Sequence, residues 1–314
     1  MSFHGFSDSC LLDLELMYHY TTKTCMTPPH VLDQSVFRDE VPRVALRYPY
    51  LMHQLLALSA FHCAYLQPDS RQRYVLHGSE HQTQAIVGMR SALERRIAEE
   101  ISFALFMTSA MLMTGSFASH LKYQHSEPLS PLAGLLEIMT LTRGLSAIRT
   151  TALAELRFNV LDKLKQNDCS QPDCKTNDVL KTQLSILQSR LSSLTDVDDA
   201  AKAVVKAGAQ SILDCMDTTK TPGTSMSSEI HLIFTWLTRL SGDFFSLLQA
   251  QHPGSLVVLL YYVVALQEAE SQCWILEGWS AQLTISIAGL LTAPWTELAQ
   301  WAMDELRHSQ GTTS

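Results

Sequence analysis

Two histidines four residues apart are the first side chains in this sequence whose spacing suggests chemistry. His77-Gly78-Ser79-Glu80-His81 fits the H-x-x-E-H pattern of inverted zinc proteases, because histidines at i and i+4 share one face of a helix. They could equally be surface and packing histidines at the start of an amphipathic helix. We favour packing, because so short a pattern often matches by chance. We therefore predict that the protein holds no metal.

An acidic run, Asp196-Val197-Asp198-Asp199, is the second candidate. Helical terpene cyclases hold magnesium with a D-D-x-x-D motif, but here Lys202 stands where the last acid belongs. The companion motif is also missing, because Lys181 occupies the position of its Ser or Thr. Acids directly before a helix cap it and match its dipole, so the run is interpreted as a cap.

Motifs for nucleophiles and nucleotides are missing. The nearest approach to G-x-S-x-G, at residues 278–282, lacks the second glycine. No G-x-G-x-x-G sequence and no P-loop occur. We therefore predict no cofactor, and the catalytic residues are unknown.

Polar and flexible side chains set in apolar helices are the remaining candidates. A pocket for an oxygenated terpenoid needs an apolar lining with a few hydrogen-bonding groups, and methionine adapts its shape to a guest. Tyr262 is the first choice because it lies in the middle of the most apolar stretch. We expect a closed cavity between the C-terminal core and the helices at 48–66 and 101–117. The predicted ligand-binding residues are Tyr18, His53, Met111, Met113, Phe117, Tyr262 and Trp274.

The stretch 256–301 must position these residues, because it is the most apolar part of the chain. It holds four of the five tryptophans and begins with eleven apolar or aromatic residues, 256–266. A membrane span needs about 20 residues, so this run predicts a helix buried on all sides and no membrane span. Elsewhere apolar residues recur mostly at spacings of three and four. The sequence predicts an all-α fold, a single orthogonal multi-helix domain of about eleven or twelve helices around a buried apolar C-terminal helix.

Domain organisation follows from one polar segment. Residues 165–178 read KQNDCSQPDCKTND and could mark an internal boundary, but both sides are rich in apolar residues. We therefore assign residues 1–314 to one domain. Before this segment, the Arg143-Gly144 pair predicts the end of a helix over 131–145. After this segment, leucines recur at alternating spacings of four and three, which predicts a helix with one apolar stripe: Leu180, Leu184, Leu187, Leu191 and Leu194.

Composition limits the partners and the compartment. The chain has 314 residues, is 46% hydrophobic and 17% charged, and carries a net charge of −8. A negative net charge disfavours binding to phosphate backbones. The seven cysteines are scattered, and the N-terminus has no signal-peptide pattern. These features predict a cytoplasmic or nuclear protein with reduced thiols, not a secreted one.

Five segments in order resemble a known family: LLDLELMYHYTTKT (11–24), VPRVALRYPYLMHQLLALSAFHCAYL (41–66), HQTQAIVGMRSAL (81–93), PLAGLLEIMTLTRG (131–144) and CWILEGWSAQL (273–283). Together they resemble the C-terminal regulatory domain of fungal binuclear-zinc-cluster transcription factors, most closely the sterol uptake control protein subgroup. The resemblance implies an all-helical domain that binds a sterol in a hydrophobic pocket. It also implies a tyrosine at position 262 and a structural role for Arg143.

The DNA-binding module of that family does not match. It requires six closely spaced cysteines among basic residues, whereas only Cys10 and Cys25 lie in the first 60 residues here. We therefore expect a regulator-like domain without the DNA-binding module and without direct DNA binding.

Two functions from different classes are consistent with these features. The first, which we favour slightly, is a cofactor-free cyclase of fungal secondary metabolism, of the pericyclase or Diels-Alderase type. It would act on a terpenoid or polyketide intermediate by holding a reactive conformer. The second is a ligand-sensing transcriptional regulator that acts through partners. In both, the partner is a hydrophobic small molecule (a terpenoid, sterol or polyketide), and a homodimer is left open.

Overall fold

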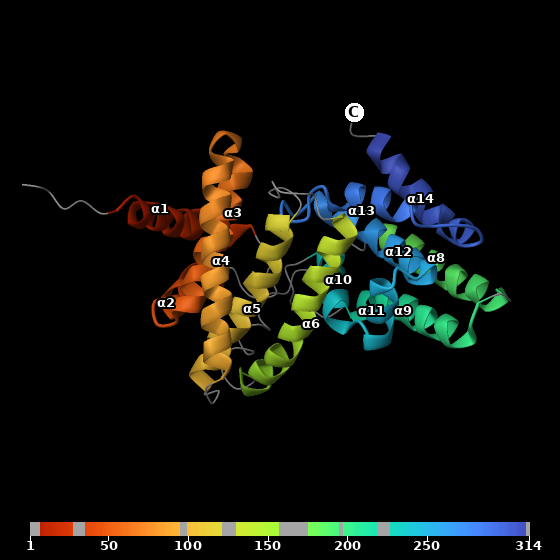
Figure 1. The fold of residues 1–314 in the computed structure, drawn as a ribbon, viewed down its shortest axis with the longest axis horizontal. Coiled ribbons are helices and arrows are strands. Elements are labelled where there is room, and N and C mark those ends of the chain that lie inside the picture. Colours follow the sequence, from red (N-terminus) through yellow and green to blue (C-terminus); the bar gives the residue numbers. More distant parts are fainter. Residues whose placement is uncertain are drawn as a thin grey trace, which may run out of the picture. The chain divides into compact units, whose positions relative to one another are not determined.

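The computed structural model describes residues 7–27, 35–94, 99–120, 130–156, 175–194, 197–218 and 227–311. Across these residues it contains thirteen α-helices and no strand (Figure 1), which confirms the predicted all-α fold. Contacts divide the chain into two compact units. The first comprises Met1–Ser126 and Gly144–Asn167, and the second comprises Glu127–Arg143 and Asp168–Ser314. The assignment of residues 1–314 to one domain stays a prediction, and most of the suggested boundary at 165–178 lies outside the described residues.

Two long helices, α3 (Pro49–Leu66) and α4 (Arg71–Leu93), lie side by side in the first unit (Figure 1). Helix α1 (Asp8–Thr22) lies across α3, and α5 (Glu99–His120) packs against α3 and α4. Residues 36–45 are helical. The short elements are η1 (Thr24–Met26), η2 (Val36–Glu40), α2 (Val41–Ala45) and η3 (Pro68–Ser70).

The centre of this unit is nearly free of charge. Helix α3 begins with Pro49 in its first turn, where no backbone donor is lost, and it contains no acidic, lysine or arginine residue. Helix α5 is similarly apolar, and its window Ser102–Ser119 has the length and composition of a membrane span. A core helix has the same properties, and 72% of that window is buried inside the structure.

Helix α12 (Pro253–Glu270) is the centre of the second unit. Each of the eleven residues 256–266 is no more than 3% exposed, which confirms the predicted helix buried on all sides. Six helices contact it: α8 (Lys175–Ser193), α9 (Asp199–Thr218), α10 (Ser228–Arg239), α11 (Gly242–Gln249), α13 (Trp279–Ala288) and α14 (Trp295–Gly311).

The leucine stripe and the acidic run predicted from the sequence both lie in this unit, and the structure agrees with both predictions. Four leucines of the α8 stripe are no more than 1% exposed: Leu180, Leu184, Leu187 and Leu191. At the start of α9, the backbone N–H of Ala201 donates to the Asp198 carboxylate at 3.1 Å, and Lys202 pairs with Asp199 at 2.9 Å. The described part of the acidic run is therefore a helix cap.

Helix α6 (Pro131–Leu156) differs from the expected boundary. The Arg143-Gly144 pair was interpreted as a helix end, but the helix continues through it. Arg143 instead donates to the carbonyl oxygen of Leu240 at 2.9 Å and lies over the ring of Phe245. A glycine inside a helix costs only about 1 kcal/mol relative to alanine, so these contacts of its neighbour can outweigh it.

Candidate functional site

Two glutamine oxygens are buried without a donor where α3, α4 and α5 meet. Gln54 of α3 is 0% exposed, and its amide nitrogen donates to the carbonyl oxygen of Met111 at 3.0 Å. Its Oε1 atom, like that of Gln82 on α4, finds no donor among the described residues. An unpaired buried acceptor costs about 1–3 kcal/mol, so a hydrogen-bond donor at this place would be stabilising.

Gly115 of α5 allows these two side chains, which we call the amide pair (Gln54 and Gln82), to lie close to the backbone of that helix. A Cβ atom at Gly115 would lie 2.9 Å from Gln82 Oε1 and 3.0 Å from Gln54 Nε2. Tyr50 stands one turn before Gln54, and its hydroxyl is also buried without a partner among the described residues. Burial raises the pKa of Tyr50, so the hydroxyl stays protonated and can donate.

The predicted ligand-binding residues on α5 lie near this place. Met111, Met113 and Phe117 are at most 6% exposed, and Met111 is bonded to the amide pair through its carbonyl oxygen. His53 of α3 belongs to a histidine cluster described below. Trp274 is half-buried in the turn after α12. Their roles toward a ligand stay predictions.

Tyr18 is 72% exposed, so its expected placement inside an apolar helix face is wrong. Helix α1 turns Leu12, Leu16 and Tyr20 inward, and Tyr18 points to solvent. Residues two apart on a helix face different directions, since each step turns the chain by about 100°.

The cavity expected between α3, α5 and the C-terminal core stays a prediction. Its proposed walls come from both units, because α3 and α5 belong to the first and α12 to the second.

Tyr262 has its hydrogen-bond partner inside the second unit. It is 0% exposed, and its hydroxyl donates to the carbonyl oxygen of Ile233 at 3.2 Å. We expect Tyr262→Phe to lower the free energy of unfolding by about 0.5–1.5 kcal/mol, because one neutral hydrogen bond is lost. Urea denaturation followed by circular dichroism measures this. A variant with unchanged stability but weaker ligand binding would instead support the ligand contact predicted from the sequence.

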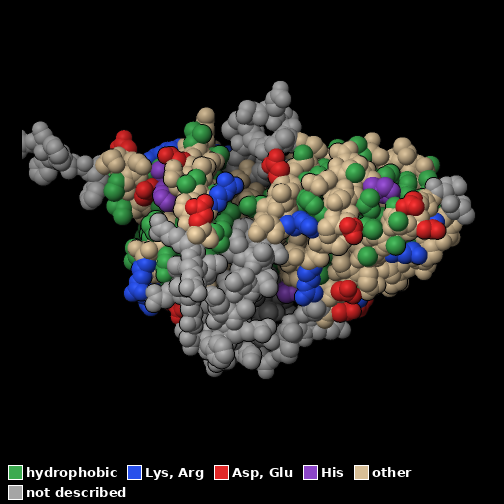
Figure 2. Space-filling model, turned by 60° about the horizontal axis from the view of Figure 1, so that its bottom comes forward, with side chains coloured by type: hydrophobic (Ala, Val, Ile, Leu, Met, Phe, Trp, Pro, Cys, Tyr) green, Lys and Arg blue, Asp and Glu red, His purple; other side chains and the backbone are tan. Residues whose placement is uncertain are grey.

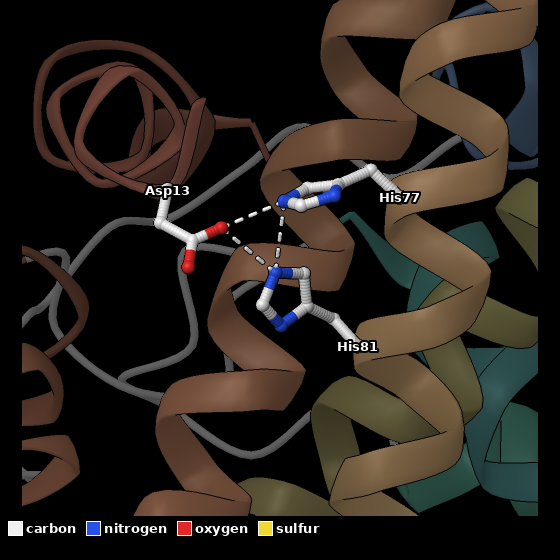
Figure 3. Close-up of side chains that lie close together, drawn as sticks. All are labelled: Asp13, His77 and His81. Carbon is white, nitrogen blue, oxygen red and sulfur yellow. Dashed lines mark hydrogen bonds and ion pairs between the residues drawn. The ribbon is translucent and has the colours of Figure 1, made fainter. Parts of the chain in front are cut away.

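A second group of polar side chains joins α1 to α4. Asp13 of α1 and His77 and His81 of α4 point toward one another (Figure 3). The Oδ1 atom of Asp13 lies 2.6 Å from His77 Nε2 and 3.0 Å from His81 Nε2, and the two Nε2 atoms are 3.1 Å apart. Figure 2 shows histidine side chains at the surface beside acidic ones. Two imidazoles and a carboxylate at such distances can hold a metal ion.

His53 extends this cluster into the unit. Its Nδ1 lies 2.8 Å from the Nδ1 of His81. Burial lowers the pKa of His53, and it lowers the pKa of His81 against the opposing effect of Asp13. Both rings therefore favour the neutral form, in which one nitrogen keeps a lone pair.

A separate histidine pair joins α1 to α3. His19 Nε2 lies 3.2 Å from His62 Nδ1, and the hydroxyl of Thr24 lies 3.0 Å from that same nitrogen. Burial lowers the pKa of His62 to about 4, with smaller contributions from His19 and Lys23. His62 is therefore a neutral packing residue at pH 7.

Sequence reasoning missed Asp13, Gln54 and Gln82. Nothing in the pattern around Asp13 marks it, because its partners stand 64 and 68 residues later in the chain. Gln54 carried a usable signal, since it is a polar residue within an otherwise uncharged apolar helix.

Together these observations describe an all-helical protein in which two buried glutamine oxygens find no donor among the described residues. No family model matches the chain. Over 282 residues it is 27% identical to sterol uptake control protein 2 of Saccharomyces cerevisiae. The aligned region covers 85% of this chain and 29% of the yeast protein. Over 115 residues it is 29% identical to sterol uptake control protein 2 of Candida albicans, covering 35% of this chain and 16% of that one. The chain thus spans less than a third of these curated relatives.

These similarities correct the first of the two functions considered. Both relatives are named sterol uptake control proteins, which supports the second function, a transcriptional regulator. They contradict the first function, a cyclase of secondary metabolism. The sequence argument failed because it relied on missing motifs. A binding domain and a cofactor-free enzyme both lack them, so their absence does not discriminate between the two.

Proposed function

We propose that this chain is the ligand-sensing part of a transcriptional regulator and that its ligand is a hydrophobic molecule with a hydroxyl group, of the sterol class. The observation that carries the proposal is the similarity to a sterol uptake control protein across 85% of the chain. A nuclear or cytoplasmic location is consistent with this role. A net charge of −8 supports the further view that these residues do not grip DNA themselves.

The amide pair supports the choice of ligand. A sterol is almost entirely apolar and carries a hydroxyl group at one end. The apolar side chains of α3 and α5 would contact the apolar part of the sterol. The side-chain oxygens of Gln54 and Gln82 would accept a hydrogen bond from its hydroxyl group.

We expect the purified chain to bind a fluorescent sterol, and Gln82→Met to weaken that binding about three- to tenfold. The change removes one neutral hydrogen bond, worth about 0.5–1.5 kcal/mol, and keeps the approximate volume of the side chain. A fluorescence titration measures both affinities. Gln84→Met on the exposed side of the same helix is the matched control and should bind like the wild type.

The two parts of the proposal fail separately. If the wild-type chain binds no sterol at micromolar concentrations, the sterol-sensing function is wrong. If it binds sterol but Gln82→Met and Gln84→Met bind equally well, the function stands and the amide pair is not the hydroxyl site.

A further inference from the structure

We propose that Asp13, His77 and His81 form a binding site for a divalent transition-metal ion of the zinc type, and that the bound ion fastens α1 to α4. The inference replaces the prediction from the sequence that the protein holds no metal. It goes beyond the proposed sterol-sensing function and does not depend on it. It rests on the mutual geometry of three ligand atoms from two helices (Figure 3).

With Asp13 ionised, hydrogen bonds do not make all three contacts favourable at once. Each of the three atoms lies within 3.1 Å of the other two. An ionised Asp13 oxygen only accepts, and each Nε2 atom either donates or accepts. If both nitrogens carry protons, two donors face each other, and if one does not, its lone pair faces the carboxylate. With Asp13 ionised, each of these two assignments leaves one unfavourable contact, whereas a cation among three lone pairs makes all three contacts favourable.

The distances are close to those of a metal site. Ligand atoms about 2.0–2.2 Å from a tetrahedral zinc ion are separated from one another by about 3.3 Å. The observed separations are 2.6, 3.0 and 3.1 Å. The largest adjustment falls on Asp13, whose side chain is 37% exposed and can shift, while His77 and His81 are 13% and 9% exposed.

His53 supplies the outer contact that metal-binding histidines usually have. With an ion on Nε2, His81 carries its proton on Nδ1 and donates it to the Nδ1 of His53 at 2.8 Å. Such a contact fixes the tautomer and the orientation of the ligating ring. His53 would therefore position His81 without touching the ion.

The donor set selects the class of ion. Two imidazoles with one carboxylate suit zinc and its neighbours in the first transition row, whereas magnesium and calcium prefer oxygen ligands. His77 also borders an open groove of about 630 Å³, whose other walls include Leu12 and Glu80. Solvent therefore reaches this ring, and a water molecule could complete the coordination.

Isothermal titration calorimetry tests the site. Protein treated with EDTA and then dialysed should bind about one zinc ion per chain and show no comparable binding of magnesium. Asp13→Ala and His77→Ala should each weaken zinc binding at least tenfold. The matched controls are Glu80→Ala, the exposed acid of the H-x-x-E-H pattern, and His308→Ala, an exposed histidine on α14. Both should bind like the wild type.

Two further measurements keep the result interpretable. Circular dichroism verifies that Asp13→Ala is folded, and zinc should raise the melting temperature of the wild type but not of this variant. Cobalt substitution should give a tetrahedral spectrum without thiolate bands, which separates this site from the cysteines. The inference is wrong if the wild type binds no zinc, if both site variants bind it unchanged, or if thiolate bands dominate.

Discussion

Trp236→Ala is expected to lower the free energy of unfolding of the second unit by about 3–5 kcal/mol, the range typical of removing a fully buried large aromatic side chain. Trp236 of α10 is 0% exposed. Its ring lies 4.5 Å from that of Tyr262 on α12 and 6.0 Å from that of Phe244 on α11, measured between centroids. Its indole N–H donates to the hydroxyl of Ser211 on α9 at 2.8 Å. One side chain therefore joins four helices, and alanine would leave a cavity and remove one of the two hydrogen bonds of the Ser211 hydroxyl.

Urea denaturation at pH 7 measures this loss of stability. Ile285→Ala is the control in the same unit, because Ile285 on α13 is 76% exposed, and it should change the free energy of unfolding by no more than about 0.5 kcal/mol. If Trp236→Ala proved as mild as Ile285→Ala, the packing of α9, α10, α11 and α12 described above would be wrong.

Acid is expected to destabilise the first unit through His62. Burial lowers the pKa of His62 from 6.5 to about 4 in the folded protein. Between these values the unfolded chain binds a proton that the folded protein does not, so stability falls as the pH falls. This contribution to stability is intact above about pH 6.5. It decreases through the window down to about pH 4, by an amount on the order of 3 kcal/mol.

His62→Gln isolates this effect, because glutamine is polar but does not titrate in this range. The free energy of unfolding of both proteins is measured by denaturation at several pH values between 7 and 4. The wild type should lose more stability than the variant as the pH falls, so the two values should converge. The histidines and carboxylates that do not contact His62 contribute alike to both curves, whereas His19, 3.2 Å from His62, belongs to the effect that is measured. Parallel curves would mean that His62 can take up a proton in the folded state.

Some features of the fold follow from local sequence alone. Eleven consecutive apolar residues at 256–266 cannot face water on any side, so they predict a central helix, and α12 is one. The leucine stripe of α8 and the cap at Asp198 also depend on residues within a few positions of each other. These patterns depend only on whether a residue avoids water and on which backbone groups lie next to it, and both can be predicted from neighbouring residues in the sequence.

Other features depend on which helices meet. Tyr18 and Tyr20 stand in the same apolar-looking segment, yet one is 72% exposed and the other 0%, because only the position of α3 defines the buried face of α1. Gly144 looked like a helix end, but the contacts of Arg143 lie about a hundred residues away in the chain. A partner distant in sequence therefore decides which face of α1 is buried and whether α6 continues past Gly144.

The candidate sites divide in the same way. The sequence by itself determined that His77 and His81 share one face of a helix and that α3 and α5 are too apolar to lie in water. Only the tertiary structure placed Asp13 between the two histidines, and Gln82 beside Gln54 and Gly115. The physical reason is that helical periodicity fixes neighbours three or four residues apart. The meeting of side chains from different helices depends instead on how the whole chain buries its apolar surface.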